Sequence, residues 1–154
     1  MRFLLLLPLC LLAACASTAP EAATQETATA TMNVAADVPA DFTLTMGEAG
    51  LSAGQMKGHT IAADGSVTAW RGKAVGQNAK EAGQLTPAQR QALWTLVESA
   101  NALEASEETM EMSHHFLIVE ANGKRQRLAW VRTNTDSIGA RLMGACQLML
   151  ASLA

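Results

Sequence analysis

The sequence lacks the motifs that most directly mark catalysis. It has no Gly-x-Ser-x-Gly, no His-Glu-x-x-His and no phosphate-binding loop. Positive charge is also scarce: the sequence has 11 Lys and Arg residues and 14 Asp and Glu residues. A nucleic-acid partner would need a basic face, so we do not expect one. These absences favour a non-catalytic protein, and we expect neither enzyme activity nor a cofactor.

Long apolar runs are missing too. The one apolar run near the N-terminus, from Phe3 to Leu12, follows Arg2. It is too short to cross a bilayer as a stable helix, which needs about 20 apolar residues. One positive charge, a short apolar run and small residues before a cysteine are typical of a secretory signal peptide. We therefore expect residues 1–14 to be a signal peptide.

The end of this run, Leu12-Ala13-Ala14-Cys15, resembles a bacterial lipobox. The resemblance implies cleavage before Cys15, a diacylglycerol on its thiol and a further acyl chain, such as palmitate, on the new N-terminus. Several acyl chains on one residue anchor a protein stably. Ala16, rather than Asp, follows the cysteine, which resembles outer-membrane sorting in enteric-like bacteria. We expect a lipid-anchored envelope protein on the outer membrane, facing the periplasm; the alternative is ordinary secretion with cleavage nearby.

Cysteine is scarce once this segment is set aside. Of three cysteines, Cys10 would leave with the signal peptide and Cys15 would carry lipid. Only Cys146 would remain, so an internal disulfide framework is excluded in the mature chain. Cys146 lies in an apolar C-terminal stretch, which favours a buried structural thiol.

The domain boundary follows from composition. Residues 15–40 are mostly Ala, Thr, Glu and Pro, with no aromatic residue, and cannot bury enough apolar surface to fold. We expect a lipidated N-terminus and a disordered tether there. Residues 41–154 have the length of one small domain.

The pattern of residues 41–154 predicts an α+β fold. The order is β-β-β-α-β-β-α, with hairpins between strands, which favours an antiparallel sheet of about five strands with two helices on one face. The expected strands are 42–46, 57–62, 66–71, 116–121 and 124–132, with 47–54 and 72–83 as loops and 103–113 as a solvated acidic loop. The dipeptides Asp64-Gly65 and Asn122-Gly123 are hairpin turn signals.

The first helix has the clearest local signature. Thr86 at the cap, Pro87 in the first turn and Gln89 three residues later form a capping box. An apolar stripe then follows at helical spacing through Leu93, Leu96, Val97 and Ala100. Thr135 or Asp136 is expected to start the second helix.

One segment raises the possibility of a metal site. If extended, Met110, Met112 and His114 point the same way. Thioether and imidazole ligands suit Cu(I), so periplasmic copper handling is our alternative function. In the competing interpretation these methionines fill gaps at the core edge.

The layout of residues 42–150, with its glycine-containing loop, resembles the emfourin group, small protein inhibitors of thermolysin-like metalloproteases. The matching residues are Gly50, Leu51, Ala53 and Gly54, whereas Glu48-Ala49 stand where a second glycine is expected and Leu51 replaces a Phe. The resemblance implies a protein-binding domain, with a protease as the candidate partner. The residues we assign to partner binding are Gly50, Leu51, Ser52, Ala53 and Gly54. In the competing interpretation Leu51 folds back onto the core.

Overall fold

The structure is a computed structural model that describes residues 37–153. The predicted signal peptide, the lipidation of Cys15 and most of the predicted tether lie outside the described residues. Among residues 37–153, no helix is long and apolar enough to span a membrane.

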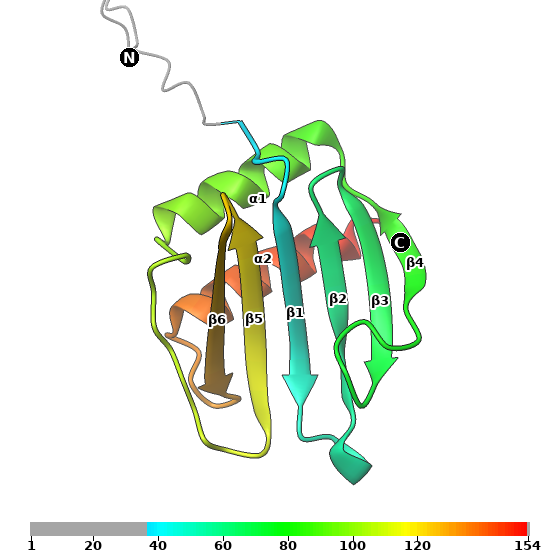
Figure 1. The fold of residues 1–154 in the computed structure, drawn as a ribbon, viewed down its shortest axis with the longest axis vertical. Helices are drawn as coiled ribbons and strands as arrows, with labels where there is room; N and C mark the ends of the chain where they lie inside the picture. The colour runs from blue at the N-terminus through cyan, green and yellow to red at the C-terminus, as the bar shows by residue number, and fades with distance from the viewer. Residues whose placement is uncertain (1–36, 154) are drawn as a thin grey trace, which may run out of the picture. The chain divides into compact units, whose positions relative to one another are not determined.

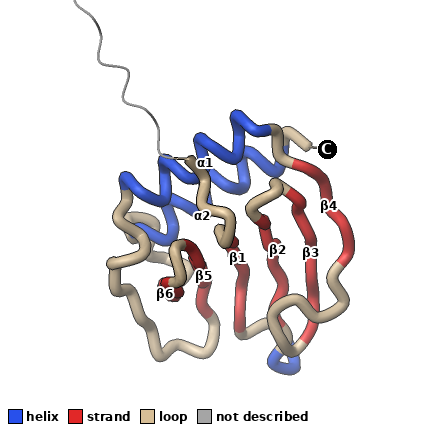
Figure 2. The backbone as a smooth tube through the Cα atoms, turned by 45° about the horizontal axis from the view of Figure 1, so that its top comes forward, coloured by secondary structure: helices blue, strands red, loops and turns tan. Residues whose placement is uncertain are grey.

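The described chain forms one antiparallel sheet of six strands in the order β4-β3-β2-β1-β5-β6 (Figure 1). Both helices lie behind this sheet, which leaves its other face open (Figures 1 and 2). The elements are β1 (Thr43–Ala49), η1 (Ser52–Gly54), β2 (Met56–Ala62), β3 (Ser66–Gly72), β4 (Lys80–Gln84), α1 (Pro87–Ser99), β5 (His114–Ala121), β6 (Lys124–Val131) and α2 (Ile138–Ala151). The predicted α+β class is confirmed.

The prediction missed strand β4, which lies at the end of the expected 72–83 loop. Its sequence, Lys-Glu-Ala-Gly-Gln, shows no apolar alternation, because β4 is an edge strand and four of its five residues are exposed. Its pairing with β3 creates the strand. Strand β1 also runs on to Ala49, beyond the predicted Met46, because Gly47 pairs with both Gly58 and Phe116.

Helix α1 begins as its sequence predicts. The Gln89 backbone N–H donates to Thr86 Oγ1 at 3.2 Å, and the Thr86 N–H donates to Gln89 Oε1 at 2.8 Å, so the capping box is complete. The buried face is rotated slightly from the predicted stripe: Trp94 is buried, whereas Leu96 is only half-buried against the core.

Helix α2 begins at Ile138 and is capped by Ser137, later than the predicted start at Thr135 or Asp136. Ser137 Oγ accepts from the Ala140 N–H at 3.0 Å. Glu107 also caps this helix, because its carboxylate accepts from the N–H groups of Ile138 and Gly139 at 2.7 and 3.0 Å. The prediction that Glu107 belongs to a solvated acidic loop is therefore wrong; the negative charge stabilises the N-terminus of α2.

The main core lies between the sheet and the helices. Its fully buried side chains include Leu44, Ile61, Leu93 and Leu117. Cys146 is also fully buried there, and burial raises the pKa of its thiol to about 12. This confirms the prediction of a buried thiol and keeps it protonated.

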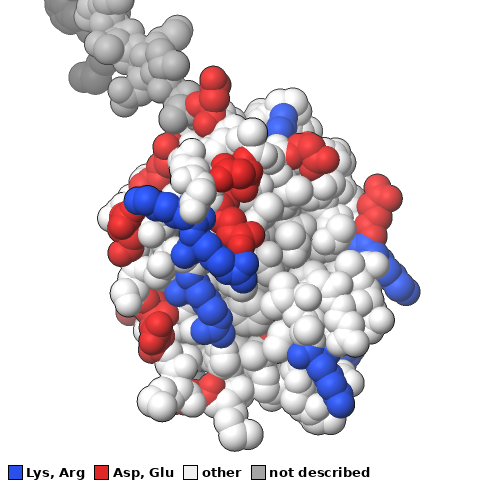
Figure 3. Space-filling model, in the orientation of Figure 1, with Lys and Arg blue, Asp and Glu red and all other residues white. Residues whose placement is uncertain are grey.

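A second, smaller core lies on the open face of the sheet. The rings of Trp70 and Phe116 stack there with centroids 6.2 Å apart. They lie over Gly47 and Gly58, where any side chain would collide with the rings and with neighbouring backbone. The guanidinium of Arg127 covers Phe116 at 5.5 Å from the ring centroid. Figure 3 shows basic side chains across the β5 and β6 half of this face.

The described chain enters at the end of the sheet that holds the β5–β6 turn (Figure 1). Asn122 and Gly123 both have positive φ, as a type I′ turn requires, so that prediction is confirmed. The Asp41 carboxylate accepts from both of their N–H groups, at 2.9 and 2.7 Å. These bonds lower the pKa of Asp41 and tie the entering chain to this turn.

Candidate functional site: the loop end of the sheet

Three loops gather at the opposite end of the sheet (Figure 1). They are the β1–β2 loop (residues 50–55), the β3–β4 loop (residues 73–79) and the segment before β5 (residues 108–113). The strand directions place them together, because β1 and β3 end there while β2, β4 and β5 begin there. We call this surface the loop end.

The β1–β2 loop is a short closed turn. The Leu51 N–H donates to the Gln55 carbonyl at 3.0 Å, and the Gly54 N–H donates to the Leu51 carbonyl at 3.1 Å. These bonds fix the loop ends and leave Ser52, Ala53 and Gly54 exposed. Ala53 has φ 60° and ψ 30°, a left-handed conformation that is costly for a residue with a Cβ. Strain of this kind is found preferentially at binding and catalytic loops.

Gly50 joins this loop to the segment before β5. It has φ +76°, and a Cβ there would collide with the Met112 carbonyl group and lie 2.6 Å from Ser113 Cα. The two backbones are therefore in close contact, and a glycine is needed at this point. The predicted partner-binding loop and the predicted methionine segment thus form one surface, which the sequence did not indicate.

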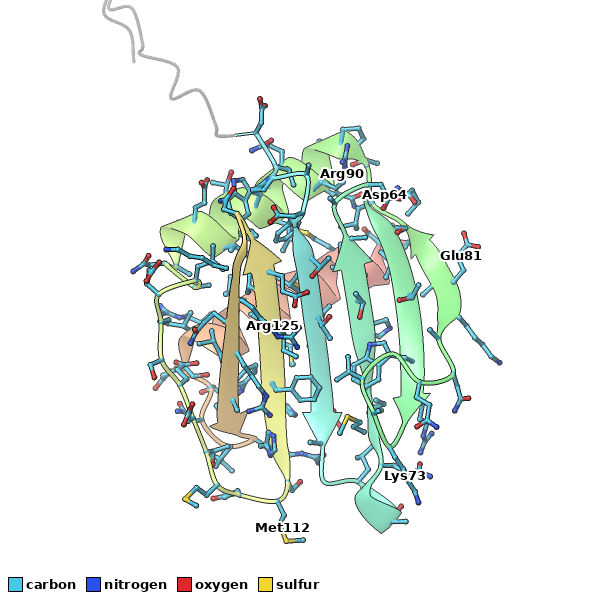
Figure 4. All side chains as sticks on the ribbon, in the orientation of Figure 1. Asp64, Lys73, Glu81, Arg90, Met112 and Arg125 are labelled. Carbon is cyan, nitrogen blue, oxygen red and sulfur yellow. The ribbon has the colours of Figure 1, made fainter. Side chains whose placement is uncertain are left out.

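Exposed apolar side chains concentrate on this surface. Among residues 37–153, four large apolar side chains are exposed, and three of them lie on these loops: Val75, Met110 and Met112, with Met110 and Met112 at 104% and 88%. Leu51, on the β1–β2 loop, is half-exposed. Figure 4 shows Met112 projecting from this end, with Lys73 on the neighbouring β3–β4 loop. Val75 was not predicted to be a binding residue, because the sequence indicated only a loop over residues 72–83.

A charged cluster lies beside the loop end on the helix side of the sheet. The Glu48 carboxylate lies 3.2 Å from Arg132 Nη2, 3.5 Å from Lys57 Nζ and 3.8 Å from His115 Nε2. Burial lowers the pKa of His115, and the attraction of Glu48 opposes that shift without overcoming it. The cluster ties β1, β2, β5 and the β6–α2 connection together next to the loops.

Of the proposed copper ligands Met110, Met112 and His114, the histidine has protein contacts at both ring nitrogens. His114 Nδ1 lies 2.7 Å from the Glu111 carbonyl oxygen, and its Nε2 lies 2.9 Å from Arg127 Nη2. Metal binding would break one of these contacts, while Met110 and Met112 extend into solvent. His115 points to the other face of the sheet, where its ring contacts Trp130 edge-on.

No protein-family profile matches the chain, and no curated protein matches it.

Proposed function

We propose that this protein is a lipid-anchored lipoprotein of the bacterial envelope whose domain binds another protein through the loop end. Inhibition of a thermolysin-like metalloprotease is the most specific form of this proposal. The observation that carries it is the exposure of Val75, Met110 and Met112 on loops at the same end of the sheet as the closed β1–β2 loop. Exposed apolar groups clustered on loops are typical of protein-binding surfaces.

The loop geometry supports binding in two ways. First, hydrogen bonds close the β1–β2 loop before any partner arrives, so binding loses less conformational entropy. Second, Met110 and Met112 are flexible and polarisable, and can adapt their shape to a partner surface. Leu51 adds a half-exposed branched side chain on the β1–β2 loop.

The position of the loop end also suits an anchored protein. The described chain begins at the opposite end of the sheet, where Asp41 is tied to the β5–β6 turn. A tether reaching back to Cys15 would join the domain there and leave the loops accessible.

The test of partner binding is a titration of thermolysin with the purified protein. We expect stoichiometric loss of peptidase activity and a complex in size-exclusion chromatography. Leu51→Asp should weaken inhibition by about tenfold or more, because it removes an apolar contact worth roughly 1.5–3 kcal/mol and introduces a charge.

The matched control is Leu148→Asp, which places the same charge at an exposed leucine of α2. It should inhibit like the parent protein, and both variants should melt near the parent temperature. Full activity of thermolysin at a molar excess of the parent protein would contradict the inhibitor form of the proposal. Equal inhibition by Leu51→Asp and the parent would show that the protease binds a surface other than the loop end.

The anchor is tested separately by labelling cells with radioactive palmitate. The parent protein should incorporate label, and Cys15→Ser should incorporate none and lose its membrane association. Label that persists in Cys15→Ser would place the lipid elsewhere.

A further inference from the structure

A cavity of about 330 Å³ opens on the helix side of the sheet, between α2 and strands β1 to β3. Helix α2 crosses behind these strands in Figure 1. The side chains that line the cavity include Met46, Glu48, Lys57, His59, Met143 and Gln147. Its volume is within the range of small-ligand sites, and it combines an apolar floor with a few polar groups.

His59 is the polar group that most needs explanation. It lies on the central strand β2 and is half-buried. Among residues 37–153, its imidazole has no hydrogen-bond or ion-pair partner, whereas His114 has contacts at both ring nitrogens and His115 has one with Glu48. Within that range no protein group occupies its ring nitrogens, and the imidazole borders the cavity, so a ligand in the cavity can reach it.

Two methionines line the same cavity. Met46 lies directly opposite His59 in the β1–β2 register, on the same face of the sheet. Side chains in such pairs have Cβ atoms about 4.5–5.5 Å apart. Met143 comes from α2 on the other side of the cavity, and both methionines are almost fully buried, at 2% and 5%. Two thioethers and an imidazole therefore border one space.

The ligand types select the metal. Among residues 37–153, no three His, Cys, Asp or Glu side chains are grouped to hold a metal ion. Thioether sulfur is a soft ligand and, with imidazole, suits Cu(I). The charges on the lining do not oppose a monovalent cation, because Lys57 is paired with Glu48 at 3.5 Å.

We propose that Met46, His59 and Met143 bind a soft monovalent metal ion, Cu(I) or its analogue Ag(I), in this cavity. The site is distinct from the Met110, Met112 and His114 segment, whose histidine already has protein partners on both nitrogens. It does not depend on the protein-binding function, because its ligands come from the body of the sheet and from α2.

The experiment is a titration of the full chain in detergent with Ag(I), followed by NMR of ¹³C-labelled methionine methyl groups. We expect one equivalent of Ag(I) to shift the Met46 and Met143 signals and to leave Met110 and Met112 unchanged. Competition with a Cu(I)-specific chelator under anaerobic, reducing conditions then measures the affinity for Cu(I). Met143→Leu and His59→Gln should each weaken it at least tenfold.

The control is Met110→Leu combined with Met112→Leu, which should bind Cu(I) like the parent. Met143→Leu conserves side-chain volume and His59→Gln conserves polarity, and matching amide spectra will show that both variants are folded. Three results would overturn the proposal: no methionine shift, shifts at Met110 and Met112 instead, or equal Cu(I) affinity in the parent and both cavity variants.

Discussion

The two faces of the sheet, one covered by helices and one without helices, bury their apolar side chains in different ways. Large aliphatic side chains from the strands interlock with the helices on the covered face. On the open face, Trp70 and Phe116 lie flat over Gly47 and Gly58, and Arg127 covers Phe116. One face is thus protected from water by a second layer, and the other by its own rings. The following variants test this difference, from the largest expected effect to the smallest.

Leu93→Ala should have the largest effect, because Leu93 is fully buried between α1 and the sheet. We expect a loss of about 2–5 kcal/mol in the free energy of unfolding, measured by urea denaturation. Leu96→Ala is the matched variant one turn away. Leu96 is only half-buried, so its loss should be clearly smaller, and equal losses would show that the buried face of α1 is assigned wrongly.

Gly58→Ala should destabilise the open face by about 1–3 kcal/mol. A Cβ at Gly58 would collide with the Met46 carbonyl oxygen and the Trp70 ring. Gly144→Ala, in α2, is the control, because a Cβ there meets no atom within 4 Å. It should raise stability by up to about 1 kcal/mol through helix propensity. Thermal melts should show a lower melting temperature for Gly58→Ala and an equal or higher one for Gly144→Ala. A Gly58→Ala protein as stable as the parent would contradict the packing of the Trp70 ring on Gly58.

Arg127→Ala should cost about 0.5–1 kcal/mol if its guanidinium stabilises the Phe116 ring as a cation–π pair. A double-mutant cycle with Phe116→Leu isolates this interaction from the loss of either side chain alone. Arg141→Ala, on the exposed start of α2, should change stability by less than about 0.5 kcal/mol. A coupling energy near zero would leave Arg127 as a solvent-exposed side chain only.

The smallest effect concerns His115, whose pKa is lowered in the folded protein, mainly by burial. The unfolded chain therefore binds this proton more readily than the folded one. Its contribution to stability is complete above the unfolded pKa, about 6.5, and is lost as the pH falls through the lower folded value. Urea midpoints between pH 7.5 and 5 should fall less steeply for His115→Gln than for the parent. Equal slopes would contradict this.

The sequence by itself determined the features that depend on neighbouring residues. The capping box of Thr86 and Gln89 and the Asn122-Gly123 turn need only local backbone geometry, and both occur as predicted. The two strands expected at 116–121 and 124–132 also occur, as the paired strands β5 and β6. Local hydrogen bonding and side-chain periodicity depend only on short stretches of sequence, so they can be predicted from it.

Only the tertiary structure decided the features that join distant residues. Strand β4 exists because β3 pairs with it, and Glu107 caps α2 from 31 residues away. The contact of Gly50 with Met112 unites two loops into one surface, and the cavity brings Met143 to His59. No local sequence pattern predicts these long-range contacts, because they follow from the packing of whole strands and helices. The candidate sites of this protein consist of residues that tertiary packing brings together, whereas its turns and helix caps could be predicted from the sequence.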